Sequence, residues 1–410
     1  MCIRDSYCSP DVRATASETI KIGVLHSLSG TMAISETTLK DTILMLVDEL
    51  NDEGGLLGKN VEAVVVDPAS DWPLFAEKAR ELLTVHNVDV IFGNWTSVSR
   101  KSVLPVIEEL NGLLFYPVQY EGEESSRNVF YTGAAPNQQA IPATNYYLDE
   151  LGVEKFALLG TDYVYPRTTN KILRAMLLAN GVPAANIGEE YAPFHHQDYQ
   201  TIVGKLRLFA RRGDAAVFCT INGDSYVPFY SEFANQGLRS EDCPIMAFSV
   251  AEDELRGMDT SALVGHLAAW NYYQSVDSPG NKKFVSNFKA YCKKKGLPGG
   301  DKRVTDDPIE AAYFGVDVWR KAVEKAGSTK VDAVRKAVYG LEFDAPGGKK
   351  KMDEGNHHTY KPVLIGEIRK DGQFTIVSKT DLVRAEPWSV YTSPDKGCDW
   401  INHKGTYKKA

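Results

Sequence analysis

Polar and aromatic side chains gather directly after strand-like segments of this sequence, where parallel strands present their carboxyl ends. The first group is Trp95, Thr96 and Ser97, which follow the apolar segment VDVIFG and precede a predicted helix. The backbone N–H groups that begin a helix and the two hydroxyl groups are donors for an acceptor oxygen, and the indole offers a flat wall. We therefore expect these residues to form one side of a binding site for a small polar molecule.

Further polar and aromatic residues follow four other strand-like segments. They are Pro117-Val118-Gln119-Tyr120 after LLFY, Tyr163 and Tyr165 after KFALLG, Asn222 after AAVFCT, and Glu252 after PIMAF. For any one tyrosine, packing at an interface with a hydrated hydroxyl group is the alternative role. Taken together, aromatic walls with a few hydroxyl, amide and carboxylate groups favour a small, flat and uncharged polar ligand.

The sequence carries no motif that indicates catalysis, a metal ion or a cofactor. It has no G-x-S-x-G elbow, no H-E-x-x-H and no G-x-G-x-x-G. The adjacent pairs His195-His196 and His357-His358 are poorly spaced for joint metal binding, and we expect surface or hydrogen-bonding roles for them. The carboxylates at 252–254 and 306–307 stand where helices are predicted to start, so capping accounts for them, and Glu252 alone is kept as a contact candidate. We expect no catalytic residue, no metal and no cofactor.

Alternating strand-like and helix-like segments must position the candidate residues. From Ile20, strands of nearly continuous Val, Ile, Leu and Phe indicate a parallel sheet that helices cover on both faces. Helices are predicted over 36–53, 73–86, 99–110, then after Thr132 over 137–151, 167–180, 198–211 and 225–237, and finally over 281–295, 308–326 and 330–340, followed by short strands from Phe343. Two such α/β lobes predict a ligand in the crevice at the carboxyl ends of their strands.

Composition excludes several classes of protein. The 410 residues carry 46 Lys and Arg against 54 Asp and Glu, a net charge of −8, and the short basic runs lack aromatic platforms, so a nucleic-acid partner is disfavoured. No apolar run reaches the ~20 residues that cross a bilayer. Six cysteines in a chain of this length do not form a disulfide scaffold, and unpaired or partly buried thiols are favoured, with a disulfide left open.

Residues 1–19 are polar and aperiodic and predict a leader rather than part of the fold. They lack the apolar run of about 7 to 15 residues of a secretory signal, yet Ala14-Thr15-Ala16 before Ser17 is a plausible cleavage site. Our hypothesis is that the natural signal segment is missing or replaced by an unrelated start. The coding sequence upstream of Met1 tests it, since an in-frame apolar segment supports it and a native promoter contradicts it.

Three strings of the sequence carry a family resemblance. GNWTSVSRKSVLPVIEELNGLLFYPVQYEGEESSRNVFYTGAAPNQQAIPA, GTDYVYPRTTNKIL and NHHTYKPVLIGEI closely resemble the substrate-binding proteins of urea ABC transporters, in the amide/urea branch of the type I periplasmic binding proteins. The resemblance implies two doubly wound parallel-sheet lobes joined by three hinge crossovers. It divides the chain into a leader remnant (1–19), lobe 1 (20–136 plus 274–345), lobe 2 (137–273 plus 346–390) and a polar, peripheral C-terminal tail (391–410).

The resemblance also implies a site and a role. Trp95, Thr96 and Ser97, with Tyr116, Pro117 and Val118, resemble the first-lobe half of the family's pocket, Tyr163 and Tyr165 resemble the second-lobe half, and Asn222 and Glu252 are weaker matches. Ser97 and backbone amides would donate to the carbonyl of urea or a short amide, and tyrosine hydroxyls, Asn222 and Glu252 would accept from its NH₂ groups. The implied role is a secreted periplasmic or cell-surface receptor that delivers its ligand to membrane permease subunits. A cytoplasmic amide-sensing regulator is the main alternative, and a urea or amide hydrolase is a weaker one.

Overall fold

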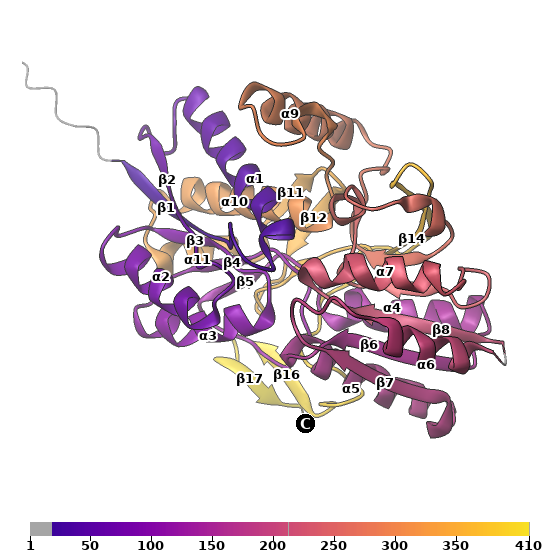
Figure 1. The fold of residues 1–410 in the computed structure, drawn as a ribbon. Helices are drawn as coiled ribbons and strands as arrows, with labels where there is room; N and C mark the ends of the chain where they lie inside the picture. Colours follow the sequence, from indigo (N-terminus) through magenta and orange to yellow (C-terminus); the bar gives the residue numbers. More distant parts are fainter. Residues whose placement is uncertain (1–18, 212, 410) are drawn as a thin grey trace, which may run out of the picture.

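The computed structural model describes residues 19–211 and 213–409 and consists of two α/β lobes, each built around its own sheet (Figure 1). The first sheet is wholly parallel, with the order β2-β1-β3-β4-β5. Its strands are β1 (Ile20–Leu25), β2 (Val61–Val66), β3 (Val90–Gly93), β4 (Leu114–Tyr116) and β5 (Val129–Tyr131). Residues 1–18 of the predicted leader lie outside the described residues.

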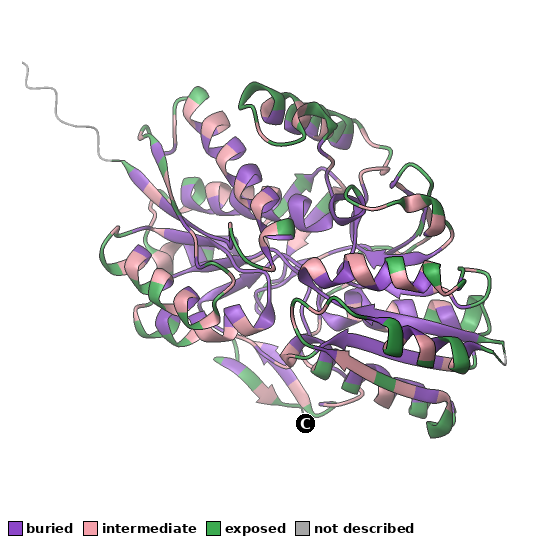
Figure 2. Ribbon diagram, in the orientation of Figure 1, coloured by how far each residue is buried: buried purple, intermediate pink, exposed green. Residues whose placement is uncertain are grey.

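Helices cover both faces of this first sheet, as the apolar strands predict. One face packs against α1 (Ala33–Asp52), α10 (Asp307–Ala326) and α11 (Val331–Val338), and the other against α2 (Trp72–Thr84) and α3 (Ser97–Glu109), while α9 (Pro279–Lys294) packs against α1. Polar caps set the helix starts: Asp71 accepts from the N–H of Leu74 at α2, and Asp306 from that of Ile309 at α10. Figure 2 shows the buried residues running along the sheet between the two helix layers.

The second lobe is built on a seven-stranded sheet with the order β15-β14-β10-β9-β8-β6-β7. Its strands are β6 (Lys155–Thr161), β7 (Ile187–Ala192), β8 (Ala215–Thr220), β9 (Ile245–Ala247), β10 (Leu267–Trp270), β14 (Leu364–Ile368) and β15 (Phe374–Lys379). Helices α4 (Ala140–Asn145) and α5 (Val164–Ala179) cover one face, and α6 (Gln200–Ala210) and α7 (Tyr226–Asn235) the other. Because β14 runs antiparallel to β10 and β15, this sheet is mixed rather than wholly parallel.

The chain passes three times between the sheets. It leaves the first sheet after β5, returns after β10 to form α9, α10 and α11, and crosses again before β14. The predicted two-lobed fold is therefore confirmed. The small sheet β11 (Glu342–Ala345), β12 (Gly348–Met352) and β13 (Thr359–Tyr360) spans the predicted boundary after Ala345, and Met352 packs in the core of the first lobe. The placement of that boundary stays a prediction.

Some local features differ from the sequence predictions. The helix predicted over 137–151 is divided into η1 (Pro136–Gln138), α4 and the π-helical turn η2 (Tyr146–Glu150), because Gln139 adopts a non-helical backbone, φ −151°. The tail contains a hairpin, β16 (Lys396–Asp399) and β17 (Gly405–Lys408). Cys219, Cys243, Cys292 and Cys398 are buried and unpaired. Across residues 19–211 and 213–409, no helix combines the length and the apolar character that crossing a membrane requires.

Candidate functional site

The first lobe contributes the start of helix α3 to the candidate site. Thr96 is the N-cap of α3, and its Oγ1 accepts from the N–H of Ser99 at 3.2 Å. The hydroxyl of Ser97 donates to Glu121, so its proton is not directed to a ligand carbonyl as the sequence suggested. Trp95, Thr96 and Ser97 are all nearly inaccessible to solvent. Of the donors predicted here, the backbone N–H groups of the first turn of α3 are therefore the ones suited to a ligand oxygen.

A buried ion-pair network lies directly behind Ser97. The guanidinium of Arg100, which is 0% exposed, donates to Glu124 at 2.7 Å through Nε and to Glu121 at 3.4 Å through Nη2. Lys101, at the edge of the network, lies 2.6 Å from Glu124. Burial alone raises the pKa of Glu124, but the attraction of Arg100 and Lys101 outweighs it and lowers that pKa to about 2. Two cations and two carboxylates thus balance each other inside the first lobe.

Tyrosines enclose this network. The Arg100 guanidinium lies 4.6 Å from the ring centre of Tyr116 and 4.9 Å from that of Tyr120. Tyr116 donates its hydroxyl proton to the carbonyl of Trp95, and burial raises its pKa. Pro117 and Val118 follow at the end of β4 and are buried. Tyr116 therefore fixes the backbone that carries Trp95.

The second lobe contributes two tyrosines and an asparagine. Tyr163 caps the start of α5, and its ring packs 4.8 Å from Phe194 and 6.2 Å from Tyr165. Asn222, after β8, donates from its backbone to Thr161 Oγ1 at 2.9 Å. These side chains come from the carboxyl ends of neighbouring strands β6 and β8, as the parallel pattern predicts.

The two halves of the site contact each other. The indole N–H of Trp95 donates to Asn222 Oδ1 at 3.4 Å, and Gln119 Nε2 donates to the carbonyl of Phe248 at 2.7 Å. Thr31 of the first lobe also donates to Asp224 of the second at 2.6 Å. The structure is therefore a closed form in which residues of the two lobes contact each other directly between Trp95 and the ends of β6, β8 and β9.

In this region Oε1 of Gln119 is buried without a hydrogen-bond partner among the described residues. Burial raises the pKa of Tyr165, and hydrogen bonds with the side chains of Ser249 and Gln119 oppose that rise, which places the three groups together. An unpartnered buried polar atom costs about 1 to 3 kcal/mol. A ligand that donates a hydrogen bond to Gln119 Oε1 would remove that cost.

Glu252 lies away from these residues. It begins the short helix α8 (Glu252–Leu255), and its carboxylate accepts from the N–H of Gln274, in the crossover that follows β10, at 2.7 Å. The next carboxylates of α8 bridge to the first lobe: Glu254 accepts from Ser35 at 2.8 Å and Asp253 from Thr38 at 2.7 Å. The structure thus brings nine of the ten predicted residues to one region and places Glu252 at the crossover, where α8 holds the lobes together.

Sequence reasoning missed two residues that shape the site, Arg100 and Glu121, and it named Gln119 as one of the residues after a strand but assigned it no role. Arg100 follows Ser97 by one helical turn, which puts both side chains on one face of α3, and this i, i+3 spacing was the available signal. Glu121 and Gln119 lie in the irregular segment after β4, where no periodicity predicts which way a side chain points.

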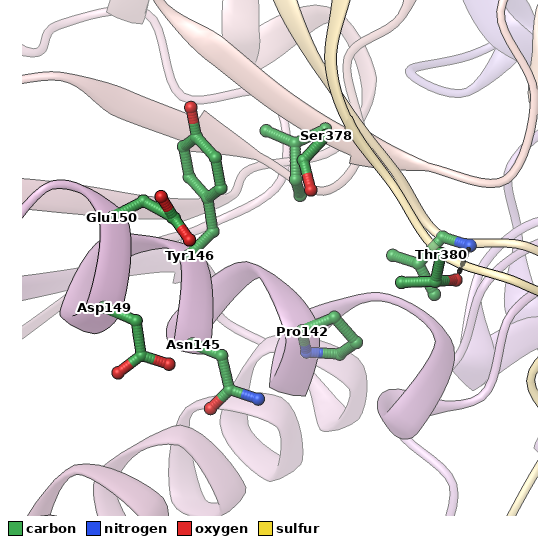
Figure 3. A pocket seen from close by; sticks show the side chains of 9 residues that line it. Pro142, Asn145, Tyr146, Asp149, Glu150, Ser378 and Thr380 are labelled. Carbon is green, nitrogen blue, oxygen red and sulfur yellow. Dashed lines mark hydrogen bonds between the residues drawn. The ribbon is translucent and has the colours of Figure 1, made fainter.

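A separate hollow lies on the surface of the second lobe. It encloses about 210 Å³ between η2 and the end of β15, and Tyr146, Glu150, Ser378 and Thr380 are among its lining residues (Figure 3). It contains none of the predicted site residues. Within the part of the chain that the structure describes, no group of three or more His, Cys, Asp or Glu side chains is arranged to hold a metal ion.

Comparison with known proteins gives consistent matches along almost the whole chain. The family model for the periplasmic binding protein domain matches residues 20–394. The Leu/Ile/Val-binding protein homolog 6 of Brucella melitensis is 25% identical over 377 residues, which cover 89% of this chain and 92% of that protein. The leucine-, isoleucine-, valine-, threonine- and alanine-binding protein of Pseudomonas aeruginosa is 24% identical over 88% of this chain and 93% of that protein.

Solved structures also match the fold over most of this chain. An ABC transporter solute-binding protein from R. palustris, in complex with 4-hydroxybenzoate, has a TM-score of 0.75 at 22% identity, covering 90% of this chain and 98% of that one. The leucine-binding protein of Thermotoga maritima has a TM-score of 0.74 at 17% identity, covering 88% and 99%. At these identities the likeness shows the fold alone.

Proposed function

This chain belongs to the periplasmic binding protein domain family, and from that premise we propose that it is the solute receptor of an ABC transporter and that its ligand is urea or a short amide. The family consists of solute-binding receptors, not enzymes. The ligands in the names of the relatives above are amino acids and 4-hydroxybenzoate, which all carry a carboxylate. Whether this chain also binds a carboxylate therefore depends on the charges of the side chains at its site.

The observation that carries the amide proposal is the neutralised Arg100. A carboxylate ligand needs a cation or several free N–H donors. The guanidinium of Arg100 is already committed to Glu121, Glu124 and Ser97, and it is inaccessible to solvent. An anion beside Ser97 would also face the carboxylate of Glu121. Arg100 is thus withdrawn from binding an anion, and a carboxylate would have the first-turn N–H groups of α3 but would lie beside Glu121, which favours a neutral molecule.

The unpartnered Oε1 of Gln119 favours a ligand with N–H donors. This atom accepts hydrogen bonds only, and the hydroxyl of Tyr165, which lies beside Gln119, accepts as well as donates. Urea has four N–H donors and one carbonyl, and a primary amide has two N–H donors and one carbonyl. We propose that NH₂ groups face Gln119 and Tyr165, that the carbonyl faces the first-turn N–H groups of α3, and that Trp95 and Tyr163 cover the flat faces.

The size of the ligand limits the affinity. At a ceiling of about 1.5 kcal/mol per non-hydrogen atom, the four heavy atoms of urea allow roughly 6 kcal/mol. This free energy corresponds to a Kd of about 40 µM. Reaching that ceiling requires nearly complete enclosure, and the closed arrangement of Trp95, Asn222 and Gln119 supports it.

The transport partners follow from the family. A receptor of this family implies an extracytoplasmic location and membrane permease subunits that accept the ligand. We propose the periplasm or the cell surface for this chain. Secretion of the full-length gene product with its native upstream sequence tests the location, and retention in the cytoplasm would instead support an amide-sensing regulator.

Calorimetric titration of the protein with urea, formamide, acetamide, leucine and 4-hydroxybenzoate tests the ligand class. We expect urea or one of the amides to bind with a Kd of roughly 40 µM or weaker, and the two carboxylates not to bind. Binding of leucine or 4-hydroxybenzoate, with no heat from urea and the amides at millimolar concentration, would refute the proposal. Small-angle scattering with and without the bound solute should show compaction.

A further inference from the structure

Gln119 has an arrangement of hydrogen bonds that differs from that of the other residues in the enclosed region. It follows β4 of the first lobe, is 3% exposed, and reaches the segment after β9 of the second lobe. There its Nε2 donates to the carbonyl of Phe248 at 2.7 Å and to the hydroxyl of Ser249 at 3.1 Å. Both amide hydrogens are thus used between the lobes, while Oε1 is buried without a partner.

The orientation of this amide is fixed by its surroundings. The carbonyl oxygen of Phe248 accepts hydrogen bonds and cannot donate, so the NH₂ group, and not Oε1, must face it. Oε1, on the opposite side of the amide group, is therefore turned away from Phe248, and it has no hydrogen-bond partner among the described residues. One planar group thus presents its donors to the second lobe and leaves its acceptor unpartnered between the lobes.

We infer that Gln119 is a specificity-determining residue whose Oε1 accepts an N–H of the ligand while its NH₂ group holds the second lobe closed. This inference rests on the proposed function, because it assigns the ligand-reading atom of the same site. A ligand N–H bonded to Oε1 adds a third hydrogen bond to this amide and holds it more firmly in the orientation that aligns both donors with Phe248 and Ser249. Ligands without an N–H leave Oε1 unpartnered and leave the contact between the lobes weaker.

Gln139 offers a matched control. It is also a buried glutamine, 3% exposed, and its Nε2 donates to the same Phe248 carbonyl at 3.2 Å and to that of Ala269 at 2.7 Å. Its Oε1, unlike that of Gln119, is not among the buried atoms without a partner. Methionine matches the length of glutamine and removes both polar atoms, so Gln119→Met and Gln139→Met remove comparable contacts to one carbonyl.

The test compares the two variants by calorimetric titration and by small-angle scattering, with thermal unfolding as a check of the fold. We expect Gln119→Met to weaken the binding of urea or the bound amide by roughly 10- to 100-fold and to lose ligand-induced compaction. Gln139→Met should change the affinity by less than roughly 3-fold and keep the compaction. Equal weakening in both variants, or unchanged affinity in Gln119→Met, would overturn the inference.

The titrations give different results if the proposed function itself is wrong. If the unsubstituted protein binds leucine and no amide, the proposed ligand is wrong, and the two variants titrated with leucine, which has an ammonium N–H, then decide the role of Gln119. If it binds 4-hydroxybenzoate alone, which has no N–H, both the proposed function and the inference are overturned.

Discussion

Arg100→Met should lower the free energy of unfolding by about 3 to 5 kcal/mol, because it leaves the buried carboxylates of Glu121 and Glu124 without their main counterion. The structure gives a second route to this magnitude. The pKa of Glu124 lies at about 2 instead of its ordinary 4.5, and at about 1.4 kcal/mol per pH unit this difference corresponds to about 3 kcal/mol. At roughly 2 cal/mol/K of unfolding entropy per residue, 410 residues imply a fall in Tm of roughly 4 to 6 °C.

The loss of stability in Arg100→Met should depend on pH, and the lowered pKa of Glu124 determines the direction of that dependence. A carboxylate whose pKa is lowered in the folded protein contributes stability above pH 4.5, and that contribution disappears as the pH falls toward 2. The gap in Tm between the unsubstituted protein and Arg100→Met should therefore be full at pH 7 and smaller at pH 3. Thermal unfolding followed by circular dichroism measures both values and avoids urea, the proposed ligand, as a denaturant.

An exposed pair of the same geometry is the control. Arg80 and Glu109 lie 2.7 Å apart but are 46% and 61% exposed, so Arg80→Met should change the Tm little. The double variant Arg100→Met with Glu124→Gln should recover part of the loss, since one uncompensated charge is then removed. Equal effects of Arg100→Met and Arg80→Met, or a gap in Tm that does not depend on pH, would refute the reasoning.

Other substitutions test other parts of the molecule. Burial and, less strongly, nearby carboxylates raise the pKa of Glu252 to about 8, so ionisation of its carboxyl group costs stability as the pH rises from 4.5 to 8. Glu252→Gln should therefore raise the Tm at pH 9 and not at pH 4. An equal shift in Tm at both pH values would contradict this. Ser35→Ala removes a hydrogen bond between the lobes to Glu254 and should weaken solute binding about 3- to 10-fold in calorimetry, without lowering the Tm. Asp71→Ala removes the N-cap of α2 and should cost about 1 kcal/mol in guanidinium unfolding, with the solute Kd unchanged.

Much of the fold could be predicted because apolar periodicity reports burial directly. The helix predicted over 308–326 is Asp307–Ala326, and the one over 281–295 is Pro279–Lys294. The ends differ by a few residues where a polar cap decides the start, as Thr96 does for α3. The antiparallel pairing of β14 in the second sheet could not be predicted, since the periodicity of a strand does not specify the direction in which it pairs.

The contact between the lobes was predictable where the topology alone determines position. Trp95 and Asn222 meet because strand ends share an edge of each sheet and the two edges face each other. The link between Arg100 and Glu124 joins residues separated by an irregular segment, so only the folded structure shows it. Glu252 also follows a strand, but α8 turns its carboxylate toward Gln274 instead of toward the enclosed space.

The triple crossing of the chain has a consequence for the order in which the protein can fold during synthesis. One apolar face of the first sheet, whose strands end at Tyr131, is covered by α10 and α11 in addition to α1. These two helices leave the ribosome only after the second lobe has received strands β6 to β10. Until Val338 has been added, the nascent first lobe exposes that face to any factor that binds unfolded chains. A chain that must pass through a membrane before it folds would thus keep its earliest lobe unfinished for most of its synthesis.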